Sequence, residues 1–303
     1  MRDSKGIALL IVLWALLLLG TLGMSFSFAM RTEAKAARNG LDGSRAYYQA
    51  RTGINRVIAL ISSASLDNVL RVPITGEEED AVYEARIASE GGKIDINLVA
   101  EETLKEILRK GGLSPEEAES VGDSILDWRD GDDVPRAKGA ESPYYLSLPA
   151  PVKPPNGKLA AVDELLSVKG VTPDLYGRFL SRVFTVHGKS LSVDINEATV
   201  EVLRVLPGFT AAAADAVVSR RLSDPFRSPA EVAIFLAEVN VPATTVKSFS
   251  TASLTRVYTI TSVGKAGGKI SRAVACRVEI GGGGRKSVKI VRWMDYVAAG
   301  EGN

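Results

Sequence analysis

The stretch IALLIVLWALLLLGTLGMSFSFAM, residues 7–30, contains no charged side chain. As an α-helix with a rise of about 1.5 Å per residue it would be roughly 36 Å long, enough to cross a hydrocarbon core about 30 Å thick. The apolar region of a secretory signal peptide is usually shorter, about 7–15 residues. The sequence therefore predicts a single transmembrane helix over residues 7–30, rather than a cleaved signal peptide or a buried core helix.

The six residues before this stretch, MRDSKG, place Arg2 and Lys5 beside the apolar segment. Basic residues that flank a membrane helix favour the cytoplasmic side. We therefore expect the N-terminus in the cytoplasm, one span in the inner membrane, and the chain after Met30 in a bacterial periplasm.

The composition excludes several classes of protein. The 303 residues, 46% hydrophobic and 24% charged, are enough for two globular domains. A net charge of +1 disfavours a dedicated nucleic-acid-binding protein. The single Cys276 excludes an intrachain disulfide, and the single His187 excludes a paired-histidine metal centre. Since no nucleophile–base set or phosphate loop is found, we expect a protein that is not an enzyme.

The rest of the chain predicts an α+β fold. Residues 31–63 repeat apolar positions at helical spacing, with a kink or break expected at Gly40 and Gly43. A mostly helical pattern fills the chain between about residue 93 and residue 240. Alternating β-rich segments with glycine-rich turns at 264–268 and 281–284 predict strands over residues 82–88, 254–263, 270–280 and 287–293. A helical domain is thus inserted within an antiparallel sheet.

The helical region contains internal repeats. Asp95-Ile96-Asn97 recurs as Asp194-Ile195-Asn196, and in both copies we expect the polar side chains to cap a following helix. A second phrase, glycine–apolar–Ser/Thr, would end one helix and cap the next, as in helix-hairpin-helix units, and it begins at Gly112, Gly170 and Gly208. A structural role is favoured because acidic residues surround these loops, but phosphate binding to DNA stays open as the alternative.

An acidic loop, DWRDGDDV at residues 127–134, is followed by Glu141. Oxygen ligands at this density suit Ca²⁺, which takes about 6–8 of them, although the spacing is not that of an EF-hand. A solvated acidic turn is the alternative interpretation. The candidate ligands are Asp130, Asp132 and Asp133, followed by Glu141 and Asp127.

The basic leader that ends in Gly6, followed by an uninterrupted apolar helix, resembles that of type IV pilins and type II secretion pseudopilins. The resemblance implies that prepilin peptidase cuts between Gly6 and Ile7 and that Ile7 is methylated. Most of these proteins carry a glutamate at mature position five, where this chain has Ile11. The missing glutamate, the helical insertion and the phrase at 127–133 resemble the minor pseudopilin K family.

This resemblance implies a pseudopilin fold, with a long N-terminal helix packed on an antiparallel sheet and a large inserted helical domain. The expected division is a leader at 1–6, a transmembrane helix at 7–30, a helix extension and first strand at 31–92, the inserted domain at 93–240 and the remaining sheet at 241–303. Structural calcium in the helical domain is also implied.

The implied function is assembly. The protein would form the tip of the periplasmic pseudopilus with minor pseudopilins I and J, contact other pseudopilins, and help initiate assembly for export of folded proteins across the outer membrane. Prepilin peptidase and the inner membrane would be further partners, and no nucleic acid is expected. The alternative is a membrane-anchored periplasmic DNA-binding protein that uses its helix-hairpin-helix units.

Overall fold

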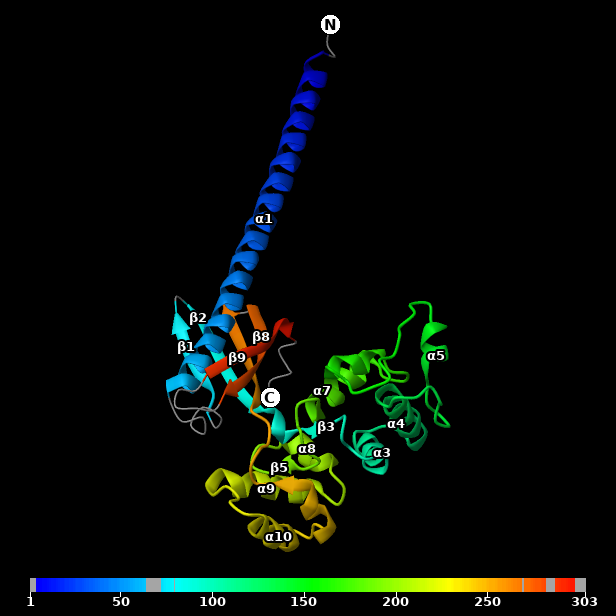
Figure 1. Cartoon of the computed structure of the whole chain (residues 1–303). Helices are drawn as coiled ribbons and strands as arrows, with labels where there is room; N and C mark the ends of the chain where they lie inside the picture. Colours follow the sequence, from blue (N-terminus) through cyan, green and yellow to red (C-terminus); the bar gives the residue numbers. More distant parts are fainter. Residues whose placement is uncertain (1–3, 64–71, 79, 269, 282–286, 298–303) are drawn as a thin grey trace.

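Helix α1 (Ser4–Ser63) extends as a straight rod from the body of the protein in the computed structural model (Figure 1). The structure describes residues 4–63, 72–78, 80–268, 270–281 and 287–297. The kink expected at Gly40 and Gly43 was a wrong prediction, because α1 passes through both glycines unbroken. A glycine inside a helix costs only about 1 kcal/mol, so it permits a break without imposing one.

A five-stranded antiparallel sheet lies against the second half of α1. The four expected strands are confirmed, and the edge strand β1 was missed. The strand order is β1-β2-β7-β8-β9, and the bounds are β1 (Ile74–Glu78), β2 (Ala81–Ser89), β7 (Val257–Ala266), β8 (Ile270–Gly281) and β9 (Ser287–Val297).

The turn between β7 and β8 is tighter than expected. Strand β7 continues to Ala266, and the turn contains Gly267 and Gly268, whose φ angles of 58° and 71° favour glycine. The second expected turn begins where β8 ends at Gly281, and residues 282–286 lie outside the described residues.

A stripe of small and branched residues on α1 forms the core with the sheet. Ala50, Ile54 and Val57 are fully buried in one cluster with Ile260 and Cys276. The approach is closest at Gly264, where a Cβ atom would lie only 1.9 Å from the carbonyl oxygen of Ala46. A side chain at that position would therefore push the helix off the sheet.

The helical domain is inserted between β2 and β7, and its buried core extends from Ile94 to Phe249, beyond the boundary expected at residue 240. Two copies of one motif build it, and each is closed by a two-residue parallel strand pair. The first contains β3 (Ile94–Asp95), α3 (Glu101–Lys110), α4 (Pro115–Arg129), α5 (Ser142–Leu146), η2 (Val162–Ser167), α6 (Pro173–Leu175), η3 (Tyr176–Leu180), α7 (Ser181–Val183) and β4 (Phe184–Thr185). The second contains β5 (Val193–Asp194), α8 (Val200–Val205), α9 (Ala211–Ser223), α10 (Pro229–Glu238), η4 (Ala243–Ser248) and β6 (Phe249–Ser250).

The repeated asparagines hold each copy together. Asn97 Oδ1 accepts a hydrogen bond from Leu159 N at 2.8 Å while its Nδ2 donates to Leu159 O at 3.0 Å. Asn196 makes the same pair of bonds with the backbone of Phe226, both at 2.9 Å. The N-cap role expected for these motifs was wrong, since α3 begins after Ala100 without a side-chain cap and α8 is capped by Thr199. Loop closure is their role in the structure.

Glu90, in the turn η1 (Glu90–Gly92), joins the sheet to the helical domain. Its carboxylate is 1% exposed and accepts hydrogen bonds from Thr185 Oγ1 in β4 at 2.5 Å and Thr259 Oγ1 in β7 at 2.6 Å. Lys93 Nζ and Arg277 Nε lie 3.6 and 3.8 Å from Glu90 Oε1. Burial alone would raise the pKa of Glu90, but the two cations and two hydroxyls lower it to about 2.

Replacing Glu90 with Gln should lower the free energy of unfolding by about 3 kcal/mol at neutral pH, because two cations then lack their buried counter-charge. Since the folded-state pKa lies below the ordinary value of 4.5, the stabilisation is complete above pH 4.5 and is lost as the pH falls towards 2. Denaturant unfolding of the full chain in detergent, followed at several pH values, measures both effects.

The matched control is Glu84→Gln on the same domain's strand β2. Glu84 is exposed and pairs with Arg86 on the surface, so its loss should change stability by less than about 1 kcal/mol. Equal losses in the two variants would contradict a special role for Glu90.

Candidate functional site

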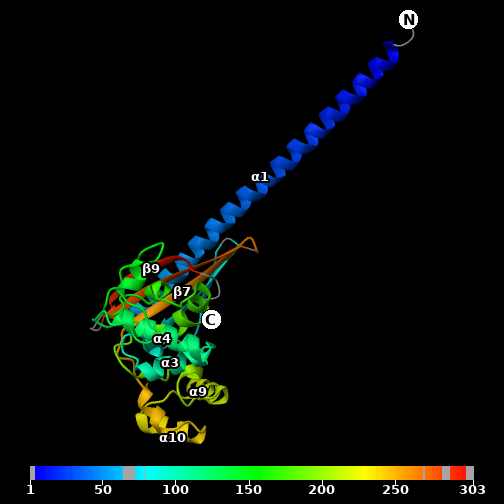
Figure 2. The ribbon, with the colours of Figure 1, turned by 90° about the vertical axis from the view of Figure 1, so that its right-hand side faces the viewer.

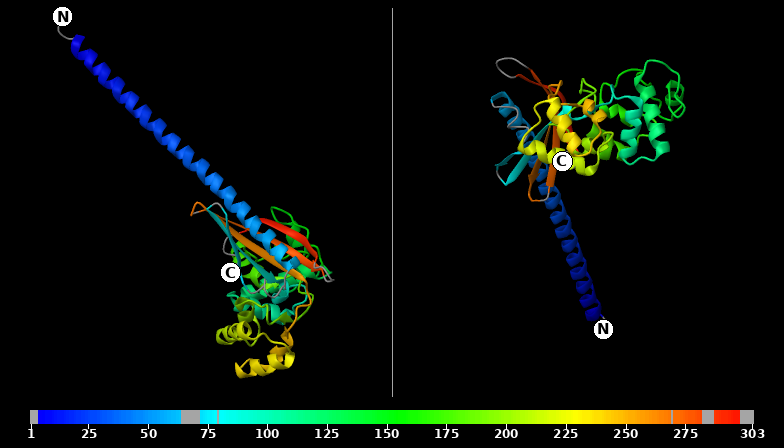
Figure 3. Two further views of the ribbon diagram at one scale, coloured as in Figure 1. Left: turned by 90° about the vertical axis from the view of Figure 1, so that its left-hand side faces the viewer. Right: turned by 90° about the horizontal axis from the view of Figure 1, so that it is seen from below.

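The expected processing site lies at the start of α1. Gly6 and Ile7 are both helical, and residues 1–3 of the expected leader lie outside the described residues. Ile7 is 58% exposed and Ile11 is 63% exposed. Among the described residues, α1 is long and apolar enough to cross a membrane. Figures 2 and 3 show this half of α1 projecting clear of the body, so its apolar side chains face outward.

The acidic loop is an insertion in the first copy of the helical motif. In the second copy, residues 222–225 connect Arg221 at the end of α9 to Phe226. In the first copy, residues 130–158 separate the corresponding Arg129 and Leu159. Both arginines donate to the carbonyl of the isoleucine in the repeated motif, Arg129 to Ile96 O and Arg221 to Ile195 O, the latter at 2.8 Å. The frame of each copy is thus shared, and the loop is an addition to it.

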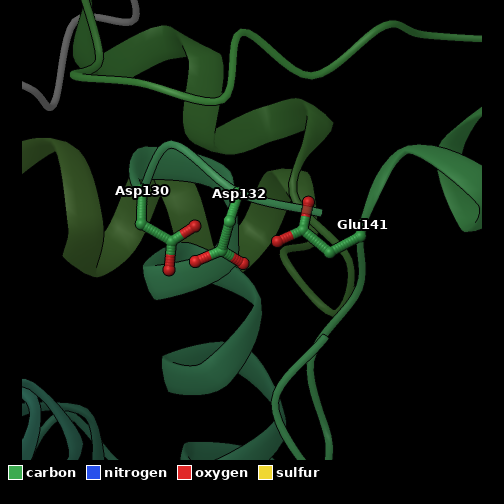
Figure 4. A group of neighbouring side chains, drawn as sticks. All are labelled: Asp130, Asp132 and Glu141. Carbon is green, nitrogen blue, oxygen red and sulfur yellow. The ribbon is translucent and has the colours of Figure 1, made fainter. Parts of the chain in front are cut away.

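Three of the five predicted ligands come together. One carboxylate oxygen from each of Asp130, Asp132 and Glu141 lies within 4.8 Å of the other two (Figure 4). Glu141 is 2% exposed, and both its carboxylate oxygens are buried without a hydrogen-bond partner. Oδ1 of Asp130 is also buried and unpartnered. A buried carboxylate without a donor is costly, so the arrangement favours a positively charged ligand.

The other two predicted ligands have different partners. Asp127 is fully buried, and Arg136 Nη1 contacts its Oδ1 at 2.7 Å. Oδ1 of Asp133 accepts hydrogen bonds from Ser142 Oγ at 2.7 Å and Asn156 Nδ2 at 2.9 Å, and these bonds lower the pKa of Asp133. Both residues therefore support the loop from outside the cluster of three.

The sequence reasoning missed Arg136. Its Nη1 also contacts Oδ2 of Asp130 at 2.6 Å, so one guanidinium compensates two of the loop's carboxylates. Nothing in the local sequence distinguishes Arg136 from other basic residues, because its role depends on the loop folding back over the end of α4.

Arg136 pairs with Asp127 and Asp130 but not with Glu141, whose carboxylate has no positive partner among the described residues. Burial raises the pKa of Glu141, and the nearby carboxylates, first Asp127 and then Asp130, Asp133 and Asp132, raise it further, to about 7. Near neutral pH this group is therefore poised between its protonated and ionised forms.

The three glycine–apolar–Ser/Thr loops fold as expected. Gly112, Gly170 and Gly208 all have positive φ angles, of 96°, 83° and 78°. The hydroxyl groups that follow cap the next helices, with Ser114 accepting from Glu117 N, Thr172 from Leu175 N and Thr210 from Ala213 N.

The lysines near these loops are engaged within the protein. Lys110 Nζ donates to Leu206 O at 2.6 Å and to Phe209 O at 3.2 Å, and Lys169 Nζ donates to Lys138 O and Gly139 O. They therefore bind backbone carbonyls within the fold, where a DNA-binding loop would direct cations towards phosphate.

A family model described as "Type II secretion system (T2SS), protein K" matches residues 59–187. The chain is 31% identical over 141 residues to type II secretion system protein K of Pectobacterium carotovorum, an alignment that covers 43% of each protein. It is 22% identical over 220 residues to the putative type II secretion system protein K of Escherichia coli K12, covering 65% of this chain and 67% of that protein.

The chain is therefore similar to type II secretion system protein K over part of its length.

A solved structure shares the fold of this chain. It is the GspK-GspI-GspJ complex of enterotoxigenic E. coli, matched with a TM-score of 0.60 and 16% identity over 89% of this chain and 100% of that chain. The predicted pseudopilin fold, a long helix on an antiparallel sheet with a large helical insertion, is thereby confirmed. The DNA-binding alternative is not favoured.

In the absence of divalent cations, the protein should lose stability as the pH rises from about 5 to about 8. The folded-state pKa of Glu141, about 7, lies above the ordinary 4.5, so its contribution is complete below pH 4.5 and is lost as the pH rises through 7. Glu141→Gln mimics the protonated acid and should remove this decline, about 2 kcal/mol at the alkaline end. Thermal unfolding with a chelator present measures it.

Glu102→Gln is the control, because Glu102 is exposed in the same domain. This variant should keep the wild-type decline. A decline that persists unchanged in Glu141→Gln would show that other groups cause it.

Proposed function

We propose that this chain is a minor pseudopilin that occupies the tip of the periplasmic pseudopilus of a type II secretion system and helps initiate its assembly. The observation that carries this proposal is the placement of the helical domain at the end of the body remote from the N-terminus of α1 (Figure 1). A subunit that joins a fibre through α1 would place this bulky domain where the next subunit would have to add. The protein would therefore end the fibre and contribute to export of folded proteins across the outer membrane.

The apolar half of α1 supports a role inside both a membrane and a fibre. A buried glutamate needs a positive partner, and a tip subunit has no subunit above it whose N-terminal amine could meet that charge. This chain has Ile11 at mature position five, where most pseudopilins carry the glutamate, and so it avoids an unpaired charge. We take prepilin peptidase cleavage between Gly6 and Ile7, with methylation of Ile7, as the step that prepares α1 for assembly.

The partners proposed are minor pseudopilins I and J, with other pseudopilins below them. Support comes from the GspK-GspI-GspJ complex, one chain of which has the same fold. The proposed location is the inner membrane, with a single span and the domain after Met30 in the periplasm. The role is assembly, and no catalytic step is proposed.

A structural Ca²⁺ bound by Asp130, Asp132 and Glu141 completes the proposal. The buried oxygens of Glu141 lack donors, and the surrounding carboxylates leave excess negative charge. A hard cation with oxygen ligands would supply the missing charge and hold the inserted loop on the end of α4. Asp127 and Asp133, held by their own partners, would keep the loop in shape around it.

Co-purification tests the assembly role. The tagged full chain, expressed with minor pseudopilins I and J and prepilin peptidase, should retain both partners, and its mature N-terminus should be methylated Ile7 by mass spectrometry. Gly6→Leu should block cleavage and leave the six-residue leader attached. A mature chain that begins after residue 30, or one that captures neither partner, contradicts the proposal.

Calcium should raise the melting temperature of the full chain by several degrees near neutral pH, because binding to the folded state alone stabilises it by roughly 3 kcal/mol at a hundredfold excess over Kd. Glu141→Gln should abolish the increase, whereas Asp133→Asn, outside the cluster of three, should keep most of it. An increase of the same size in Glu141→Gln would place the metal elsewhere.

A further inference from the structure

Three cations follow the apolar segment of α1 along one face of the helix. Arg31, Lys35 and Arg38 have the spacing i, i+4, i+7, which places their side chains on the same side. All three are exposed. Glu33 is the acidic residue between positions 31 and 41. It is two residues from Arg31, so it lies on a different face of the helix from the three cations. We call these three cations the juxtamembrane trio.

The fold does not use the juxtamembrane trio. Every residue from 31 to 41 is exposed, and contact with the sheet begins only near Gly43. Within the described part of the chain, no ion pair or hydrogen bond involves any of the three side chains. Figures 1 and 2 show this part of α1 standing alone between the body and the apolar end.

Membrane orientation does not explain the juxtamembrane trio. Cations that direct orientation belong on the cytoplasmic flank, where this chain has Arg2 and Lys5. Three more on the opposite flank oppose that bias. An interaction on the far side of the membrane would account for their presence.

The juxtamembrane trio lies at the depth of the lipid headgroups. If residues 7–30 cross the hydrocarbon core, Arg31 lies at its edge, with Lys35 and Arg38 roughly 6 and 10 Å further along the axis. The headgroup layer adds about 5–8 Å on each side of the core. Long basic side chains can also bend back towards the interface. All three cations can thus reach lipid phosphates.

We propose that Arg31, Lys35 and Arg38 bind the headgroups of anionic phospholipids in the leaflet on the far side of the membrane from the leader. Charge complementarity supports this occupant, since an anionic leaflet attracts each nearby cation by about 1 kcal/mol, a factor of about five. The site goes beyond the assembly role and rests only on the membrane span. Leaving the membrane for a fibre would require these contacts to be broken.

Lipid selection by the reconstituted full chain tests the proposal. Vesicles of phosphatidylcholine would contain a trace of spin-labelled phosphatidylglycerol or spin-labelled phosphatidylcholine, and electron paramagnetic resonance would report the fraction of each bound at the protein. The wild type should select phosphatidylglycerol by at least about five-fold, less at high salt. The triple variant Arg31→Gln, Lys35→Gln, Arg38→Gln should lose most of this selectivity.

The matched control is the double variant Arg45→Gln, Arg56→Gln. Both arginines are exposed on the same side of α1, but they lie roughly 21 and 38 Å from Arg31 along the axis, well beyond a Debye length of about 8–10 Å. This variant should keep the wild-type selectivity, and an equal loss in it would overturn the proposal.

Two further outcomes would also overturn it. Full selectivity in the triple variant, together with loss of binding to other pseudopilins, would make the trio a protein-binding surface. Failure of the wild type to insert into neutral phosphatidylcholine vesicles would remove the membrane span itself, whereas failure to bind pseudopilins I and J would leave the lipid site standing.

Discussion

One helix has to satisfy two environments without a break in its backbone. A helix bonds its own N–H and C=O groups, so α1 can leave an apolar medium and continue onto a protein surface with no change of structure. Only the side chains change, from the exposed apolar residues of 7–30 to the buried stripe that includes Ala50, Ile54 and Val57. Gly53 does not interrupt it, because the sheet supports the helix on both sides of that residue. The position of both domains relative to the membrane follows from this continuity.

Two buried glutamates show how the surroundings decide the state of one chemical group. Glu90 and Glu141 are 1% and 2% exposed, yet the pKa of the first is lowered to about 2 and that of the second is raised to about 7. Burial raises the pKa of both, but cations and hydroxyls face Glu90 while other carboxylates face Glu141. The first therefore serves as a permanent joint between two domains, and the second leaves a demand for positive charge.

The repeated motif explains why the helical domain could be recognised from the sequence alone. Residue spacing predicted the glycine loops and their hydroxyl caps, because such signals act within a few residues of one another. The repeat of Asp95-Ile96-Asn97 was visible, but its role was not. Asn97 bonds Leu159, far along the chain, and no local rule identifies that partner. Likewise the acidic cluster was visible, but its division into Asp130, Asp132 and Glu141 on one side and Asp127 and Asp133 on the other depends on Arg136, Ser142 and Asn156.

By itself, the sequence determined the membrane helix, the sheet's four main strands, the inserted helical domain and the acidity of its loop. These are properties of hydrophobic period, turn residues and charge count, which are set over short stretches of chain. Only the tertiary structure decided that α1 is unbroken, that Glu90 binds two strands from different domains, and that three of five carboxylates meet. The last two outcomes depend on residues distant in sequence that share one low-dielectric volume, where the sum of all neighbours sets the energy of each group.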